Sequence, residues 1–315
     1  MTNPKVSPIP RSLDNLLADT PEQFTLDNGL TVVFHHNAAH RVISTQAWIR
    51  TGSIHENKYL GSGLSHFLEH MLFKGSESMK PGEVATKVQA FGGQINAYTS
   101  FDRTVYYIDG PSEAFHTSLE LLSEMVFRSI LPEEEVTKER EVILREIDMT
   151  LDDPDRILSR SLFRTAYRMH PFRYPVIGIR SLFEGIQRNT LWDYYKARYQ
   201  PENVVLSIAG DVDRDTLLKG LETTFATIPR KSLEPVILPE EKPQLALREI
   251  RQYGDYQTAR GYLAYKIPSM RHQDAPALSI IAAIIGSGHS SRFRQNLREE
   301  RNLVHEVNAS SWNPA

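Results

Sequence analysis

A stretch rich in proline, glutamate and lysine interrupts the chain and limits how it can fold. From residue 228 to residue 243 the sequence has no hydrophobic periodicity, which is typical of a linker. The part before it is long enough to bury a core of its own. We therefore predict an N-terminal extension at 1–23, a first domain at 24–228, a linker at 229–244 and a second domain from 245 onward.

The first domain mixes two apolar patterns. Asp27-Asn28-Gly29 joins two β-rich runs and predicts a hairpin. Other segments alternate like strands or carry apolar residues at helical spacing, with helix start and stop signals. The predicted strands are 42–50, 98–109 and 203–209, and the predicted helices are 61–75, 115–127, 132–152 and 191–199.

The second domain repeats the order of strand and helix loosely. We predict a strand at 261–265, a helix at 277–285 and a further helix through Arg298. The sequence ends at Ala315, so this domain is expected to be truncated relative to the first.

Composition excludes several classes of protein. The chain has 315 residues, no cysteine and a formal net charge of −3. It lacks the basic footprint of a nucleic-acid binder and any basic amphipathic or long apolar segment for a membrane. Without a secretory signal at the start we expect a cytoplasmic protein, with the periplasm as an alternative. Any metal has to be bound by His, Asp or Glu.

The segment His66-Phe67-Leu68-Glu69-His70 has the spacing of a metal site on a helix. At 100° per residue, one face of the helix is apolar, and His66, Glu69 and His70 lie on the opposite face. Two imidazoles one turn apart can bind the same ion. The alternative is a chance pair of surface histidines. The apolar face consists of Leu64, Phe67, Leu68, Met71 and Leu72.

A catalytic zinc site needs a third protein ligand and an open position for water. The helix that begins at Pro132 offers Glu139 and Glu146, which are seven residues apart and therefore share one face. Either carboxylate alone could equally be a solvated surface charge, as we expect for the glutamates that follow Pro132.

The order His-x-x-Glu-His resembles the inverzincin signature of the pitrilysin, insulinase and mitochondrial processing peptidase family. The segment from Glu139 to Ile147 resembles the family's distal ligand helix, and Glu146 lies 76 positions after His70 (146 − 70). The resemblance implies one Zn²⁺ bound by His66, His70 and Glu146. It also implies that Glu69 is the general base and that Glu139 orients the ligands.

The segment Gly92 to Thr99 resembles the family's substrate-binding edge strand. The resemblance implies that Asn96 and Ala97 contact a peptide substrate, which adds to the sheet as a further strand. The alternative is a glycine-rich turn before an ordinary strand.

The pattern departs from the family in the second domain. Family members carry an Arg and a Tyr seven residues apart, which steady the substrate carbonyl. Arg298 occupies the Arg position, whereas His305 occupies the Tyr position. His305 could donate in place of the phenol. Alternatively, a second chain supplies the pair, which makes a homodimer or a heterodimer with a paralogous subunit. In a third reading the segment is structural and the enzyme is slow.

The resemblance implies an α+β fold, with a mainly antiparallel sheet flanked by helices in each of two similar domains. It implies a zinc endopeptidase that hydrolyses peptides or unfolded polypeptides. The alternatives are a scaffold on the same fold that has lost the zinc chemistry, and a different zinc hydrolase on a similar pair of helices.

Overall fold

The computed structural model describes residues 20–312 and residue 314. The chain forms two compact units, Met1–Glu249 and Ile250–Ala315. This division falls near the start predicted for the second domain. Of the predicted extension at 1–23, residues 1–19 lie outside the described part of the chain.

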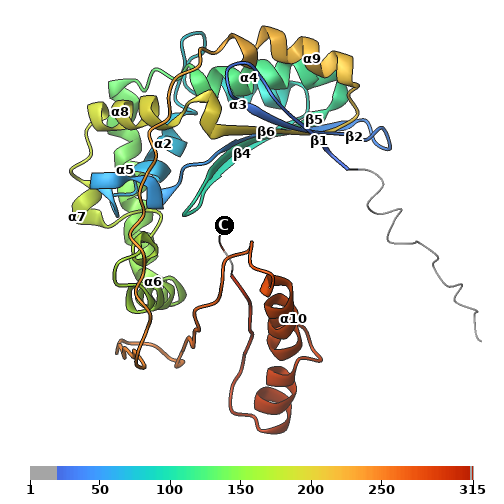
Figure 1. Cartoon of the computed structure of the whole chain (residues 1–315). Coiled ribbons are helices and arrows are strands. Elements are labelled where there is room, and N and C mark those ends of the chain that lie inside the picture. Colours follow the sequence, from blue (N-terminus) through green and yellow to red (C-terminus); the bar gives the residue numbers. More distant parts are fainter. Residues whose placement is uncertain (1–19, 313, 315) are drawn as a thin grey trace, which may run out of the picture. The chain divides into compact units, whose positions relative to one another are not determined.

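A six-stranded sheet forms the centre of the first unit (Figure 1). Its strand order is β1-β2-β6-β3-β5-β4, and every neighbouring pair is antiparallel except β2 with β6. The mainly antiparallel sheet predicted for this domain is therefore confirmed. The strands are β1 (Glu22–Thr25), β2 (Thr31–His36), β3 (Val42–Ile49), β4 (Gln94–Thr99), β5 (Thr104–Pro111) and β6 (Val204–Gly210).

The predicted hairpin joins β1 to β2. Gly29 has φ +90°, which glycine adopts at little steric cost. The Gly29 N–H donates to the Leu26 carbonyl, and the Leu26 N–H donates to the Leu30 carbonyl. The short turn therefore fixes the register in which Phe24 faces Val32.

Helices cover one face of this sheet. In β3 every second side chain is buried, because α4 packs against β3 and β5. In Figure 1, α3, α4 and α9 lie over the sheet, whereas α2, α5 and α8 gather beyond one end of it. The helices are α2 (Leu64–Met71), α3 (Glu83–Ala90), α4 (Phe115–Phe127), α5 (Glu133–Asp152), α6 (Pro154–Ala166), α7 (Arg180–Phe183), α8 (Arg188–Arg198) and α9 (Arg214–Thr223). Short 3₁₀ turns are η1 (Ser53–His55), η2 (Asn57–Tyr59), η3 (Ser112–Ala114), η4 (Pro171–Arg173), η5 (Pro201–Asn203) and η6 (Phe225–Thr227).

The strand predicted at 98–109 is two strands. β4 ends at Thr99 and β5 begins at Thr104, and between them the Ser100 N–H donates to the Arg103 carbonyl. Residues on both sides of this turn are rich in β-branched and aromatic side chains, so composition alone did not reveal the reversal of the chain. The reversal brings β4 to the edge of the sheet.

In the second unit the predicted strand at 261–265 is wrong. None of the described residues 250–312 forms a strand, and a strand requires hydrogen bonds to a neighbouring strand. The Leu263 and Tyr265 side chains are therefore largely exposed. The two predicted helices are present, as α10 (Ala275–Gly286) and the π-helical segment η7 (Arg294–Glu300). Among the described residues, no helix is long and apolar enough to cross a bilayer.

Candidate metal centre

The buried stripe of α2 holds the two histidines of the site in place. Leu64, Phe67, Leu68 and Met71 are fully buried in the core, as their helical spacing predicted. Gly63 precedes the helix with φ +76°, and a Cβ atom at this position would collide with the Ile177 carbonyl oxygen. Glycine therefore lets the chain enter α2 closely packed against a second segment.

A buried carboxylate caps the start of the same helix. The Ser65 N–H donates to Glu56 Oε1 at 2.8 Å, so one of the free N–H groups of the first turn finds an acceptor. Burial raises the pKa of Glu56 to about 8, although the N–H and hydroxyl donors around it work against this shift. Sequence reasoning missed Glu56, because it lies before the helix and outside the metal motif.

Helix α5 carries the two carboxylates of the site. It starts after Pro132, and three glutamates occupy its first turn, where the helix dipole favours negative charge. Glu139 is buried, whereas the Glu146 side chain, two turns later, is 40% exposed. Because α5 packs against α2, Glu139 reaches His70 and Glu146 reaches both histidines.

His66, His70 and Glu146 each bring one ligand atom to a common point. The two Nε2 atoms are 3.3 Å apart, and Glu146 Oε2 lies 4.0 Å from each of them. Bonds of about 2.0–2.1 Å in a tetrahedral zinc site place ligand atoms about 3.3 Å apart. The histidine pair has this spacing, and the carboxylate lies slightly farther out. The three residues form the one group of potential ligands found in the described part of the chain.

Glu139 orients His70. The Nδ1 atom of His70 lies 2.9 Å from Glu139 Oε1, so Nδ1–H donates to the carboxylate and leaves the Nε2 lone pair for a metal. Burial disfavours the charged imidazole, but the Glu139 hydrogen bond and the nearby Glu146 and Glu69 carboxylates outweigh this effect and raise the pKa of His70. Lys74 Nζ binds the other Glu139 oxygen at 2.7 Å.

The His66 imidazole is neutral near neutral pH. Burial and the neighbouring His70 lower the pKa of His66 to about 3. Two imidazole nitrogens that both present lone pairs, together with a carboxylate oxygen, repel one another unless a cation lies between them. This donor set therefore fits a divalent metal ion such as zinc.

Glu69 lies beside the ligands and is held by Thr99, the last residue of β4. The Thr99 hydroxyl donates to Glu69 Oε2 at 2.6 Å. Burial raises the pKa of Glu69, against the effect of this hydrogen bond and of His70, and the Glu146 charge adds to the rise. Sequence reasoning assigned no role to Thr99, although it closes the segment singled out as an edge strand.

Asn96 and Ala97 lie on β4, at the open edge of the sheet. Asn96 is exposed, and its Oδ1 accepts from the Ala97 N–H at 2.8 Å. Because Thr99 is on the same short strand, the edge runs directly towards Glu69.

The last two predicted site residues lie in the second unit. Arg298 belongs to η7, and its Nη1 lies 3.6 Å from Glu299 Oε1. His305 is exposed and follows η7 after its end at Glu300. The two residues therefore do not share one helix.

Comparison with known proteins agrees with this centre. Residues 31–179 match the insulinase family (peptidase family M16), and residues 185–313 match the peptidase M16 inactive domain. The zinc protease YmxG of Bacillus subtilis, itself described as uncharacterized, is 32% identical over 91% of this chain and 69% of its own length. The zinc protease PqqE of Helicobacter pylori is 31% identical over 91% of this chain and 65% of its own length.

A solved protease from Helicobacter pylori has the same fold. It superposes with a TM-score of 0.84 at 28% identity and covers 94% of this chain and 72% of that one. The chain therefore belongs to the insulinase family of peptidases, in which its relatives are named zinc proteases. The predicted family and α+β fold class are confirmed.

Proposed function

We propose that this chain is a zinc-dependent endopeptidase that hydrolyses peptide bonds in peptides or unfolded polypeptides. The observation that carries the proposal is the convergence of His66 Nε2, His70 Nε2 and Glu146 Oε2. The Glu69 carboxylate lies next to them. When bound by these residues, zinc supplies Lewis-acid activation of water and of the scissile carbonyl.

Glu69 is assigned as the general base. Its raised pKa suits proton transfer near neutral pH better than the pKa of an ordinary carboxylate. Because the Thr99 hydroxyl binds Oε2, we assign Oε1 to take the proton from water and to pass it to the leaving amine. Glu139 holds the His70 ring, so the Nε2 lone pair keeps its direction during the reaction.

The edge of β4 is the proposed docking place for the substrate backbone. An extended peptide can add to an exposed strand through main-chain hydrogen bonds. Asn96 and Ala97 lie on this strand, and Thr99 links it to Glu69. A substrate bound there would place a backbone carbonyl close to the base. This preference for an extended peptide distinguishes the proposal from another kind of zinc hydrolase.

The test separates metal binding from catalysis. Elemental analysis should find one zinc per chain in both the wild type and Glu69→Gln. Cleavage of a mixed peptide library should be chelator-sensitive in the wild type and should fall by about 10²–10⁴-fold in Glu69→Gln. Glu133→Gln, an exposed glutamate in the first turn of α5, is the control and should behave as wild type.

Two results would contradict the assignment. Full cleavage by Glu69→Gln would remove Glu69 as the base. A wild type without zinc and without cleavage would favour the scaffold alternative.

We further propose that a second chain, either another copy or a paralogue, completes the site. The support is His305 at the position of the family's tyrosine, outside the helix that carries Arg298. Loss of one transition-state donor typically costs about 10²–10³-fold in rate. Specific activity should therefore rise with protein concentration or on addition of a paralogue that carries the Arg/Tyr pair. Activity that is independent of both would leave His305 as the donor, or the enzyme slow.

A further inference from the structure

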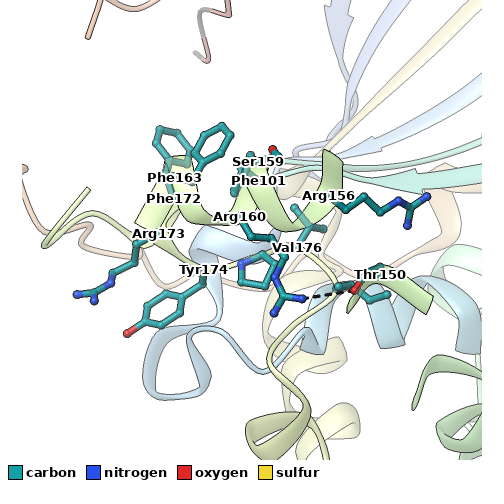
Figure 2. Close-up of a pocket in the computed structure, with 12 residues that line it drawn as sticks. Phe101, Thr150, Arg156, Ser159, Arg160, Phe163, Phe172, Arg173, Tyr174 and Val176 are labelled. Atoms are coloured by element: carbon teal, nitrogen blue, oxygen red, sulfur yellow. Dashed lines mark hydrogen bonds between the residues drawn. The ribbon is translucent and has the colours of Figure 1, made fainter. Parts of the chain in front are cut away.

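A cavity of about 290 Å³ lies in the first unit, and Figure 2 shows the residues that line it. Its walls come from α5, α6, η4 and the loops after β4 and η4. The His66, His70 and Glu146 ligands are not part of its lining. The cavity is therefore distinct from the proposed reaction centre, although α5 contributes to both.

Two wall residues tie the cavity to the site. Thr150 is one helical turn after Glu146 on α5, and such neighbours are about 5–6 Å apart at Cβ. Phe101 follows Thr99, the residue that holds Glu69, by two positions. A peptide whose scissile bond lies at Glu69 would therefore have side chains within reach of the cavity.

Aromatic rings form one side of the cavity. The Phe101 ring lies 5.4 Å from Phe163 and 5.0 Å from Phe172, measured between ring centroids. These apolar rings lower the local dielectric, so a charge in the cavity interacts more strongly than it would in water. The volume suits a single large side chain.

The Arg160 guanidinium lines the cavity without a counter-charge among the described residues. Arg160 is partly buried, and its Nη1 donates to Thr150 Oγ1 at 3.4 Å (Figure 2). No carboxylate in the described part of the chain forms an ion pair with it. A guanidinium has five N–H donors, so most of its capacity is open to a ligand. Burial lowers the pKa of Arg160, because removal from water disfavours the charged guanidinium.

A second arginine of the lining provides the contrast. Arg156 is more exposed, and its Nε lies 3.3 Å from Asp153 Oδ2. Its charge is therefore already balanced within the chain.

Arg173, the third arginine of the lining, also forms no ion pair in the described residues, but its Nη1 donates to the Arg168 carbonyl and its guanidinium lies 5.5 Å from the Tyr174 ring. Arg160 has no such carbonyl or ring contact in the same part of the chain, so its guanidinium is the more open to a ligand.

We infer that this cavity is a specificity subsite that binds an acidic substrate side chain, with glutamate the best fit, through Arg160. The inference rests on the proposed peptidase function. The carboxylate would pair with the guanidinium by charge-assisted hydrogen bonds, and the methylene groups of glutamate would pack on the phenylalanine rings. Glutamine has the same shape without the charge, so a Glu/Gln pair of peptides isolates the interaction.

Binding is measured on zinc-loaded Glu69→Gln protein, which should not cut the probes. The probes are fluorescently labelled short peptides that differ only by Glu or Gln, with this residue moved along the sequence. Fluorescence anisotropy should show about tenfold tighter binding of the Glu peptide at one position. Adding Arg160→Met should abolish this ratio, and adding Arg160→Lys should restore part of it.

Arg156→Met in the same background is the matched control and should keep the Glu/Gln ratio. Thermal unfolding of each variant checks that it is folded, and the Arg160→Lys variant tests the subsite if Arg160→Met unfolds. Equal binding of Glu and Gln peptides at every position would overturn the subsite. A preference for apolar residues that does not change with Arg160 would do the same.

Cleavage by the wild type separates the two proposals. Cleavage without any Glu/Gln difference in binding would overturn the subsite and leave the peptidase proposal standing. Glutamate-selective binding that depends on Arg160, in a protein that cleaves nothing, would support the subsite and count against the peptidase.

Discussion

The two units of the chain differ in where their apolar side chains lie. In the first unit, the apolar stripe of α2 is fully buried and packs into one core with the sheet. In the second unit, α10 is the more apolar helix by sequence, yet Ile280, Ile281 and Ile284 are each at least 50% exposed. An apolar helix becomes a rigid support for chemistry only when other elements cover its apolar face.

The candidate metal centre depends on this difference. His66 and His70 keep their spacing because the opposite face of α2 is anchored. In the second unit, Arg298 and His305 lie on a short π-helical segment and beyond its end. Substitutions in the first unit should therefore change stability, metal binding or activity more than matched substitutions in the second unit.

Removal of a buried aromatic ring should give the largest difference in stability between variants of the two units. Phe67→Ala should lower the free energy of unfolding of the first unit by about 3–5 kcal/mol, because it leaves a cavity in a packed core. Ile281→Ala in α10 should change stability by less than about 0.5 kcal/mol. Chemical denaturation measures both, and a similar loss from the two variants would break the comparison.

The buried carboxylate that caps α2 should make stability depend on pH. Because the folded pKa of Glu56 is raised to about 8 from 4.5, the folded state holds a proton in this window that the unfolded state has released. Stability of the metal-free protein should therefore fall as pH rises from 5 to 8, by up to about 4 kcal/mol. Glu56→Gln should flatten the profile, and Glu306→Gln in the second unit should not. Denaturation at several pH values tests this, and an unchanged slope in Glu56→Gln would contradict it.

Glu139 should matter for metal affinity. Glu139→Gln weakens the hydrogen bond that orients His70 and should lower zinc affinity by about 10–100-fold. Glu299→Gln, which changes a carboxylate beside Arg298, should leave the affinity unchanged. Competition with a chromophoric chelator measures both constants. Equal affinities in all three proteins would show that the Glu139 contact is not needed.

Thr99 should have the smallest of these effects. Thr99→Val keeps the shape of the side chain and removes the hydroxyl that donates to Glu69 Oε2. The turnover number should fall by about tenfold at constant zinc content, because one hydrogen bond to a charged group is lost. Its pH profile should shift upward, since the lost bond favours the ionised base. Ser279→Ala in α10 is the control. A Thr99→Val variant with wild-type rate and pH profile would leave this residue without a positioning role.

Local rules were enough for much of the first unit. The hairpin at Gly29, the helices α4 and α5 and the buried stripe of α2 follow from turn chemistry, capping and periodicity within short windows. The spacing of His66 and His70 on one face of a helix is a local property of the same kind. The resemblance to the insulinase family then pointed to Glu146, which no local pattern could select over Glu139.

Other features could not be predicted from short windows of the sequence. The turn within 98–109 lies between two runs of similarly β-rich composition, and the strand at 261–265 lacked the neighbour that its pattern assumed. β6 lies between β2 and β3, although more than 150 residues separate it from both along the chain. Such pairings depend on the whole sheet.

The order of residues along the chain was enough to show which residue types can act, which of them share a helix face, and which family the chain resembles. The contacts of Glu139 with His70, Thr99 with Glu69, Glu56 with the start of α2 and Arg160 with the cavity became visible only in the folded chain. The two groups of features differ in the sequence separation of the residues that interact. Helix faces and turns arise from interactions between residues a few positions apart, whereas these contacts require the packing of elements that are distant in sequence.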